Sequence, residues 1–350
     1  MTRRLAYVTL AAALMVAAAA WSGARAQDAV FSQFYAAPLL LNPAFAGTAR
    51  APSIALNHRS QYVGFAGTVP YQTYSVSYGQ YLAPLRSGIG VSLFADDAGD
   101  NLFGTYGATA YYSYQVDLGD DNSVRVGMSA GAKHVRVDWD RLVFGDQLNA
   151  NTGELGPGGT PTPTREQRPG ETQTTYLDLG AGLLYAGRVA YLGVSADHLT
   201  TPDDRIASVG ADGFYKGLPM RWSVHTGAQI NLRGARARRG KEAFVTPNVL
   251  YARQGPFDQV NAGAYVQVGA LFGGAWFRHA FGNGDAAIGV VGVEYGMYKF
   301  GYSYDYTVSA LSQVSAGTHE LSLQIDFEEA AWIKARRRNN RYNDCLNLFR

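Results

Sequence analysis

The sequence predicts an all-β protein, a transmembrane antiparallel β-barrel of about 14 strands with a short N-terminal segment folded at its mouth. Three observations lead to this prediction. Segments in which large apolar side chains alternate with small or polar ones recur along the chain. The connections between these segments are alternately long and short. No run of about 18 apolar residues follows the leader. The last observation excludes a helical membrane span in the mature chain.

The first 26 residues have the parts of a secretory signal peptide. Two arginines precede an apolar run over residues 5–20, and residues 24–26 (Ala-Arg-Ala) have the small-x-small pattern of a cleavage site. We therefore expect the mature chain to start near Gln27, outside the cytoplasm. The residue directly after this site is not a cysteine, so we expect no lipid anchor there.

Composition limits how the chain is stabilised and what it binds. A single cysteine, Cys345, cannot form an internal disulfide, so stability must come from burial or from a bilayer. Charged residues make up only 17% of the chain, which favours contact with outer-membrane lipid. The net charge of +2 is too small to indicate a nucleic-acid partner.

Alternation locates the strands. In "GTYGATAYYSYQV", for example, every second residue from Tyr106 to Tyr114 is Tyr or Ala, and the residues between them include Gly, Thr and Ser. Most such segments have about the 9 to 11 residues with which a tilted strand crosses a bilayer. The expected strands are 51–60, 71–80, 87–96, 104–116, 123–137, 174–185, 188–196, 219–231, 243–254, 258–270, 274–281, 286–296, 298–306 and 317–327.

Over residues 51–327, long and short connections alternate, as they do in an outer-membrane barrel. Counting from a periplasmic N-terminus, every odd-numbered connection lies outside, and these include the longest, 138–173 and 197–218. Even-numbered connections are as short as two residues, as at 186–187 and 296–297. The alternative is a soluble antiparallel protein, in which nothing requires long and short connections to alternate. We therefore expect the protein in the cell outer membrane.

The two faces of the strands differ in chemistry. The apolar set is expected to face lipid: Tyr106, Ala108, Ala110, Tyr112 and Tyr114 on one strand, and Phe300, Tyr302, Tyr304 and Tyr306 on another. The opposite face carries Arg125, Lys133, Asp178, Arg221, His225, Glu294, Lys299, Asp305, Gln324 and Asp326. Because burial of unpaired charge is costly, we expect these groups to pair and to give a largely closed interior. A conduction path along the same groups is the alternative.

Three stretches resemble one known family. "FSQFYAAPLLLNPAFAG" (31–47), "RSQYVGF" (59–65) and "YLDLGAGLLYAGRVAYLGVSADHL" (176–199) are similar to the PorP/SprF family of Bacteroidota outer-membrane proteins, which is associated with type IX secretion and gliding motility. The motif positions are Phe31, Ser32, Gln33, Asn42, Pro43, Gly47, Arg59, Gln61 and Gly64. The resemblance implies a barrel that helps to export cargo or holds an exported adhesin at the cell surface. It also implies two kinds of partner: an exported surface protein with a C-terminal secretion domain, and periplasmic ring or lipoprotein components.

The segment over residues 27–50 precedes the first strand and is too short and too proline-rich to span a membrane. We expect it to fold back into the periplasmic mouth or lumen, with a turn at Asn42-Pro43, and to close the pore. The competing interpretation is that it lies flat on the membrane or on a partner.

Two basic stretches lie on the predicted periplasmic side, at 233–241 and in the tail 328–350. They predict a docking site for an acidic partner, with ordinary solvated turns as the alternative. The arginines concerned are Arg236, Arg238, Arg239, Arg336, Arg337 and Arg338.

No motif indicates catalysis, a cofactor or a bound metal. The six histidines lack zinc spacing, no G-x-S-x-G elbow occurs, and "GAGLLYAG" (180–187) lies inside a strand rather than between a strand and a helix. "DDAGDN" (96–101) lacks the spacing of a calcium loop. Two other functions remain open on sequence: an outer-membrane diffusion channel (porin-like), and a barrel enzyme acting on lipids or peptides.

Overall fold

The structure is a computed structural model that describes residues 28, 30–49, 51–63, 70–148, 163–166, 168, 170–202, 217–232, 243–281, 285–308, 317–327 and 346. In chain order its strands are β1 (Ser53–Gln61), β2 (Tyr71–Leu82), β3 (Ser87–Ala98), β4 (Phe103–Asp117), β5 (Ser123–Val137), β6 (Gln173–Ala186), β7 (Ala190–Asp197), β8 (Arg221–Ala228), β9 (Ile230–Asn231), β10 (Ala243–Gln254), β11 (Phe257–Val268), β12 (Leu271–Ala280), β13 (Asp285–Tyr295), β14 (Tyr298–Thr307) and β15 (Thr318–Asp326). Short 3₁₀ turns lie in the connections: η3 (Ala83–Leu85), η4 (Trp139–Arg141) and η5 (Gly145–Gln147).

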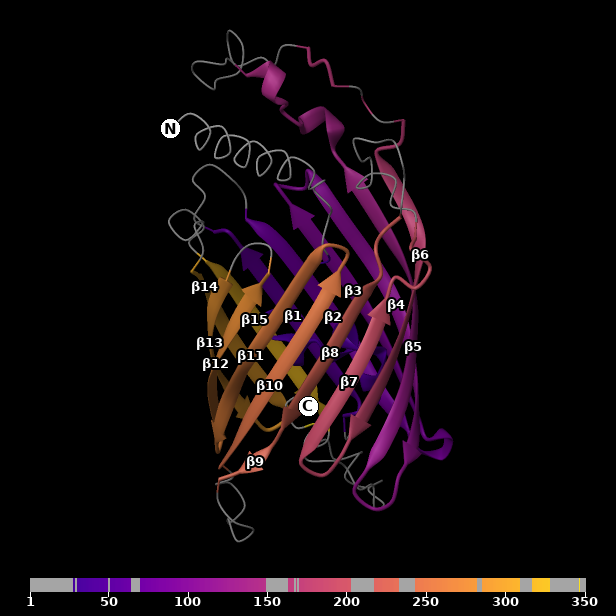
Figure 1. Cartoon of the computed structure of the whole chain (residues 1–350), viewed down its shortest axis with the longest axis vertical. Helices are drawn as coiled ribbons and strands as arrows, with labels where there is room; N and C mark the ends of the chain where they lie inside the picture. The colour runs from indigo at the N-terminus through magenta and orange to yellow at the C-terminus, as the bar shows by residue number, and fades with distance from the viewer. Residues whose placement is uncertain are drawn as a thin grey trace, which may run out of the picture.

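The strands form one closed antiparallel barrel (Figure 1). The first strand closes against the last, from the pair Ser53–Asp326 to the pair Gln61–Thr318. β8 and β9 both pair with β10, and they are two halves of one strand interrupted after Ala228. The wall therefore has 14 strands within the described residues, which confirms the predicted fold class.

The predicted strand boundaries agree closely with the structure. The segments 123–137 and 243–254 match β5 and β10 to the residue. The largest shift is in β12, which starts at Leu271 rather than at 274, because Gly269 has a positive φ of 62° and turns the chain earlier. The tight turn brings the start of β12 directly opposite Val268, the last residue of β11.

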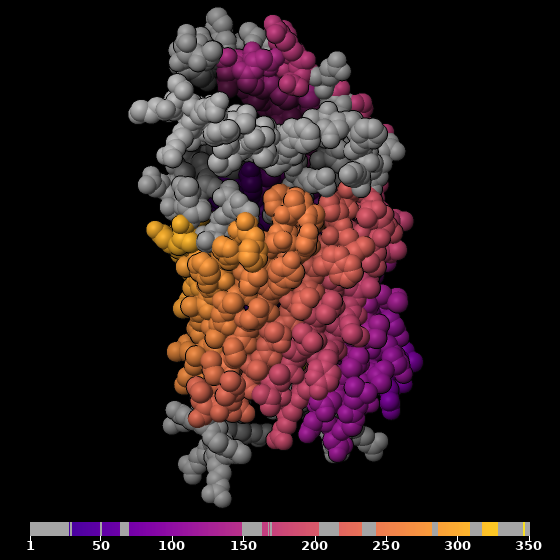
Figure 2. Space-filling model, viewed as in Figure 1, coloured from indigo at the N-terminus to yellow at the C-terminus, as the bar shows by residue number. Residues whose placement is uncertain are grey.

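The wall has an apolar outer face and a polar inner face, as predicted. Outward aromatic side chains such as Tyr112 and Phe300 are 45% and 43% exposed, whereas the inward His225 and Asp305 are 0% and 1% exposed. Glu294, the last inward position of β13, lies at the barrel end and is exposed. A closed barrel with an apolar outer face is a membrane-spanning structure. From the side shown in Figure 2 the wall is a continuous surface of side chains.

Two ends of the barrel are distinguished by their connections. The loop end carries the connections after β1, β3, β5, β7, β10, β12 and β14, and the turn end carries those after β2, β4, β6, β9, β11 and β13. Among the described residues, no helix is long and apolar enough to cross a membrane.

The N-terminal segment lies inside the barrel rather than flat against its outside. Residues 28–49, the lumenal segment, contain η1 (Phe34–Ala36), α2 (Pro38–Leu41) and η2 (Pro43–Phe45). From 31 to 49, every residue is buried except Pro38 and Leu40, which are half-buried. The segment passes from the loop end, where Asp28 contacts His198 just after β7, to the turn end, where it precedes β1.

Candidate functional site

The candidate functional site is the contact between the lumenal segment and the barrel wall. Short helical turns form because Pro38 and Pro43 each occupy a first helical turn, where the missing N–H costs nothing. Such short turns leave many backbone carbonyl groups without partners, and buried groups of this kind must be paired. Wall side chains donate to them: Asn57 to Ala36, Arg221 to Leu40, Ser195 to Leu41, and both Ser113 and Arg125 to Ala46.

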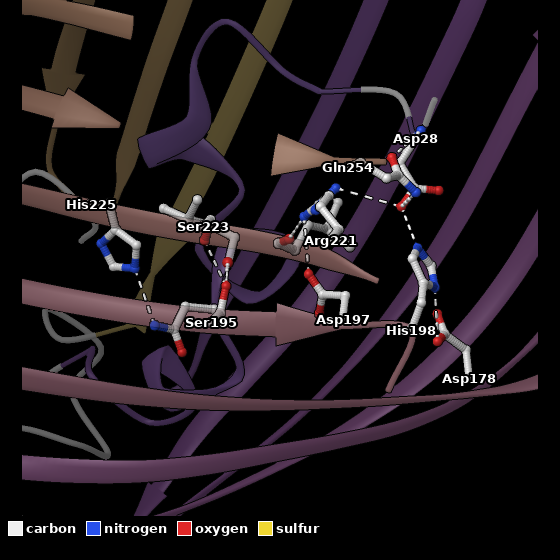
Figure 3. A network of polar contacts seen from close by, with 12 residues as sticks. Asp28, Asp178, Ser195, Asp197, His198, Arg221, Ser223, His225 and Gln254 are labelled. Atoms are coloured by element: carbon white, nitrogen blue, oxygen red, sulfur yellow. Dashed lines mark hydrogen bonds and ion pairs between the residues drawn. The ribbon is translucent and has the colours of Figure 1, made fainter. Parts of the chain in front are cut away.

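Asp28, at the start of the segment, lies among charged side chains at the loop end (Figure 3). Its carboxylate is 2.5 Å from Nε2 of His198, 3.7 Å from Nζ of Lys133 and 3.8 Å from Nη1 of Arg221. Its backbone N–H donates to the side chain of Gln254 at 3.1 Å. The first residue of the described chain is thus bound to three cations of the wall.

The wall side chains of this network also pair with each other. Asp178 accepts from Nδ1 of His198 at 2.9 Å and lies 3.3 Å from Lys133. Arg221 lies 3.3 Å from Asp197. With His198 protonated, three cations face three carboxylates, so the network is neutral as a whole.

Both ring nitrogens of His198 face carboxylates, which requires the doubly protonated ring. Burial opposes this charge, but the Asp28 carboxylate and the two hydrogen bonds outweigh it and raise the pKa of His198 to about 9. Burial likewise disfavours ionised Asp28, yet Lys133, His198 and Arg221 hold its pKa well below its usual range.

These shifts predict how stability depends on pH. The folded pKa of His198 lies above the unfolded value of 6.5, so its contribution is complete below pH 6.5 and is lost as pH rises through about 9. We expect the free energy of unfolding to fall by on the order of 3 kcal/mol across that range. Urea unfolding in detergent at several pH values measures it. His198→Gln should show a much smaller fall, and an equal fall in this variant would contradict the assignment.

The motif residues Ser32 and Gln33 are held by one buried carboxylate of β15. Glu320 accepts the backbone N–H of Ser32 at 2.8 Å and that of Gln33 at 2.9 Å, one on each oxygen. Nε of Arg59, on the neighbouring β1, lies 3.1 Å from the same carboxylate. Glu320 is 1% exposed and Arg59 6%, so this ion pair is shielded from water.

The side chains of the same two residues reach further wall groups. The Ser32 hydroxyl donates to Asp305 at 2.5 Å and accepts from Arg278 at 2.8 Å, while Arg278 lies 2.9 Å from Asp305. The Gln33 amide bonds Ser303, the backbone carbonyl of Glu320, and Ser322. The Phe-Ser-Gln motif therefore joins the segment to β12, β14 and β15.

An aromatic stack continues the contact toward β11 and β12. The ring of Tyr35 lies 6.3 Å from that of Tyr265 and 5.6 Å from that of Trp276, both near parallel, and Phe34 meets Tyr35 edge-on at 5.9 Å. Such pairs stabilise beyond the area they bury.

Asn42 joins the segment to β6, β7 and β8. Its side-chain oxygen accepts from the N–H of Ala44, which caps η2 and gives the turn at Asn42-Pro43. Its amide nitrogen lies 3.3 Å from the carbonyl oxygen of Leu183, 3.1 Å from that of Val194 and 3.1 Å from Nε2 of His225. Asn42 is fully buried, so these contacts replace all of its hydration.

Small residues of the wall make room for this contact. A Cβ at Gly182 would overlap the side chain of Asn42, and one at Gly193 would overlap the ring of His225. Phe45 stacks on that ring at 5.3 Å. Beside it, Ser195 bonds Ser223 at 2.6 Å (Figure 3).

At the turn end the segment lies directly against the wall backbone. Gly47 has a φ of 67°, a conformation that glycine adopts without strain. A Cβ at Gly88 of β3 would overlap the carbonyl oxygen of Ala46, and one at Gly127 of β5 would overlap the backbone of Ala44. Here no side chain separates the segment from the wall.

Gly88→Ala is therefore expected to destabilise the protein by about 1–3 kcal/mol, since the added methyl must displace the segment or the strand. Gly289→Ala is the matched control, because a Cβ there meets nothing within 4 Å. Both variants can be compared by thermal unfolding in detergent. Equal melting temperatures would show that the segment does not press against β3.

The sequence model of the family described as type IX secretion system membrane protein PorP/SprF matches residues 24–325. The chain belongs to the PorP/SprF family. It is a membrane component of the type IX secretion system.

The PorP/SprF chain is also similar to solved structures of other outer-membrane barrels. No curated protein matches. The Ralstonia pickettii toluene transporter TbuX aligns with 83% of this chain and 93% of its own, at 9% identity and a TM-score of 0.45. A mutant of the Rh. blastica porin aligns with 79% of this chain and 99% of its own, at 11% identity and a TM-score of 0.33.

The predicted site residues of this PorP/SprF protein fall into three groups. The structure brings Phe31, Ser32, Gln33, Asn42, Pro43 and Gly47 into the lumen, and it places Arg59 on the inner face. Gln61 ends β1, opposite Thr318 and Tyr71. Gly64 and the basic residues Arg236, Arg238, Arg239, Arg336, Arg337 and Arg338 lie outside the described residues.

Sequence reasoning missed Asp28 of the segment and three wall residues that bind the segment: His198, Arg278 and Glu320. Glu320 could have been found from the sequence, because the alternation of polar and apolar side chains along β15 places its charge on the inner face. Among the described residues, no group of three or more His, Cys, Asp or Glu side chains could hold a metal ion.

Proposed function

We propose that this protein is a non-enzymatic component of the type IX secretion and gliding system in the cell outer membrane, where it helps to export or anchor a surface protein. The observation that carries the proposal is the occupied lumen. Residues 31–49 pack against the inner wall with backbone and side chains bonded along their length. A barrel filled in this way acts through its two ends, not through its interior.

The loop end would face the cell exterior and the turn end the periplasm. An exported surface protein with a C-terminal secretion domain is then the partner at the loop end, beside the connections 138–173 and 197–218. Periplasmic ring or lipoprotein components are the partners at the turn end. The arginines at 236–239 and 336–338 are proposed to dock them.

The second candidate is a porin-like diffusion channel, which the barrel architecture also permits. The buried pairs Arg59–Glu320 and Arg278–Asp305 argue against it, because they bond the lumenal segment to the inner wall. A diffusion channel of this size needs a water-filled path.

A mild-detergent pull-down of the tagged protein from its native outer membrane tests the proposal. We expect a large exported protein or periplasmic ring components at near-equal amounts with the barrel, identified by mass spectrometry. Recovery of the barrel alone, together with steady conductance of the wild-type protein in a planar bilayer, would favour the channel.

A further inference from the structure

The hydrogen-bonded contact between β6 and β7 is much shorter than β6 itself. We call this contact the β6–β7 seam. β6 has 14 residues and pairs with β5 up to Gln173, opposite Arg136. β7 has only eight, and its Cα pairs with β6 run from Ala181–Ala196 to Ala186–Tyr191. At the loop end, β6 therefore rises above β7 and β8 (Figure 1).

The lumenal network explains why β7 stops. His198 follows β7 directly, has a φ of 58°, and is bound to Asp28 at 2.5 Å and to Asp178 at 2.9 Å. Thr201 also has a positive φ, 42°, so the chain bends away from the sheet. The last bond of the seam runs from the Leu199 N–H to the Leu179 carbonyl at 3.0 Å.

Beyond that bond, β6 presents a sheet edge. Successive residues of a strand direct their N–H and C=O groups to opposite sides. Since the Leu179 carbonyl points toward β7, the backbone groups of Leu177, Thr175 and Gln173 point the same way. Within the part of the chain that the structure describes, no backbone group pairs with them there. We name residues 173–179 the β6 edge.

Apolar side chains lie on both faces of the β6 edge, and its one charged residue, Asp178, is already paired with Lys133 and His198 on the inner face. On the outer face Leu177 is 73% exposed, against 48% for Leu183, which has β5 and β7 on either side. On the inner face Tyr176 packs with Val135 and Leu218. A strand edge flanked by apolar side chains is a template for another strand, and unpaired edges of this kind are otherwise avoided.

A second copy of the chain does not fit this edge. Antiparallel pairing of two β6 edges would turn one barrel upside down in the membrane. Parallel pairing about a twofold axis would place each residue opposite the same residue of the other copy. In a parallel pair, however, a residue that bonds across the pair bonds the residues before and after the one opposite, and the opposite residue points away. The occupant is therefore not a second copy of this edge.

We propose that the β6 edge binds an extended, uncharged segment of the exported surface protein as an added strand. Residues 173–179 span about 20 Å, which suits a strand of roughly six residues. The flanking leucines and Tyr176 favour β-branched or aromatic side chains on both faces of that segment. The proposal rests on the anchoring role proposed above.

Photocross-linking in native cells locates the occupant. When a benzophenone amino acid replaces Leu177, we expect it to cross-link the surface protein that co-purifies with the wild-type barrel. The cross-linked peptide should have the alternating side-chain pattern of a β-strand. The same probe at Leu183 lies on the same outward row but between two paired strands, so it should not cross-link that protein. A cross-link from position 177 to another barrel, or to no surface protein, overturns the proposal.

Two substitutions at one position separate the backbone from the side chain. Leu177→Pro removes the N–H that points to the edge and leaves the β5 ladder intact, whereas Leu177→Ala keeps that N–H. We expect retention of the surface protein to fall about tenfold in the proline variant and to change little in the alanine variant. Heat modifiability on a gel verifies that both barrels fold.

The outcomes distinguish the two proposals. If the surface protein co-purifies with the wild type and equally with Leu177→Pro, the β6 edge is not its binding site, while the anchoring role stands. If no surface protein co-purifies with the wild type, the anchoring role fails, and the edge proposal fails with it.

Discussion

Deleting residues 28–47 is expected to turn the closed barrel into an open channel. The deletion removes the segment that fills the lumen, and a 14-strand wall lies between the small barrels that side chains fill and the 16–18-stranded barrels that hold water. In a planar bilayer the wild type should show no steady conductance, and the variant discrete steps with at least about tenfold more current.

The wall should survive this deletion. Arg59 pairs with Glu320, and Arg278 with Asp305, directly across neighbouring or nearby strands without help from the segment. In the variant, water that enters the lumen can solvate the wall groups that the segment contacts in the wild type. Heat modifiability identifies folded protein. A folded variant without added conductance would show that the lumenal segment does not close the pore.

The fold was predictable from the sequence because its signals are local. A period of two residues in side-chain polarity marks each strand wherever one face meets lipid and the other does not. "SVRVGMSAGAKHVRV" carries that signal through the whole of β5, and its ends are set by Asp120-Asp121-Asn122 on one side and Asp138 on the other. Turn chemistry shifts such boundaries by only a few residues, as Gly269 does for β12.

The contacts of the lumenal segment could not be predicted in the same way. Ser32 and Glu320 are 288 residues apart in the chain, and they meet only because β15 closes against β1. Which inward residue lies at which height depends on the stagger of all the strands together. The motif identified the segment as important, but it did not indicate that His198 holds Asp28 at the opposite side of the lumen.

The same non-local contacts predict the largest effect of a single substitution. Glu320→Ala removes the acceptor of two backbone N–H groups and leaves the buried guanidinium of Arg59 without a carboxylate. Removing one partner of a buried ion pair costs about 3–5 kcal/mol, so we expect the free energy of unfolding to fall by that amount. Urea unfolding in detergent measures the loss, and protease sensitivity of residues 28–37 reports release of the segment.

Asp117→Ala is the matched control, because Asp117 is also an inward-row carboxylate but is exposed at the turn end of β4, where it accepts from the exposed end of Gln115. Its loss should cost less than about 1 kcal/mol. The double variant Arg59→Ala with Glu320→Ala should be less destabilised than the sum of the two single variants, because it leaves neither charge unpaired. Strict additivity would mean that the two side chains do not interact, which would contradict the buried ion pair.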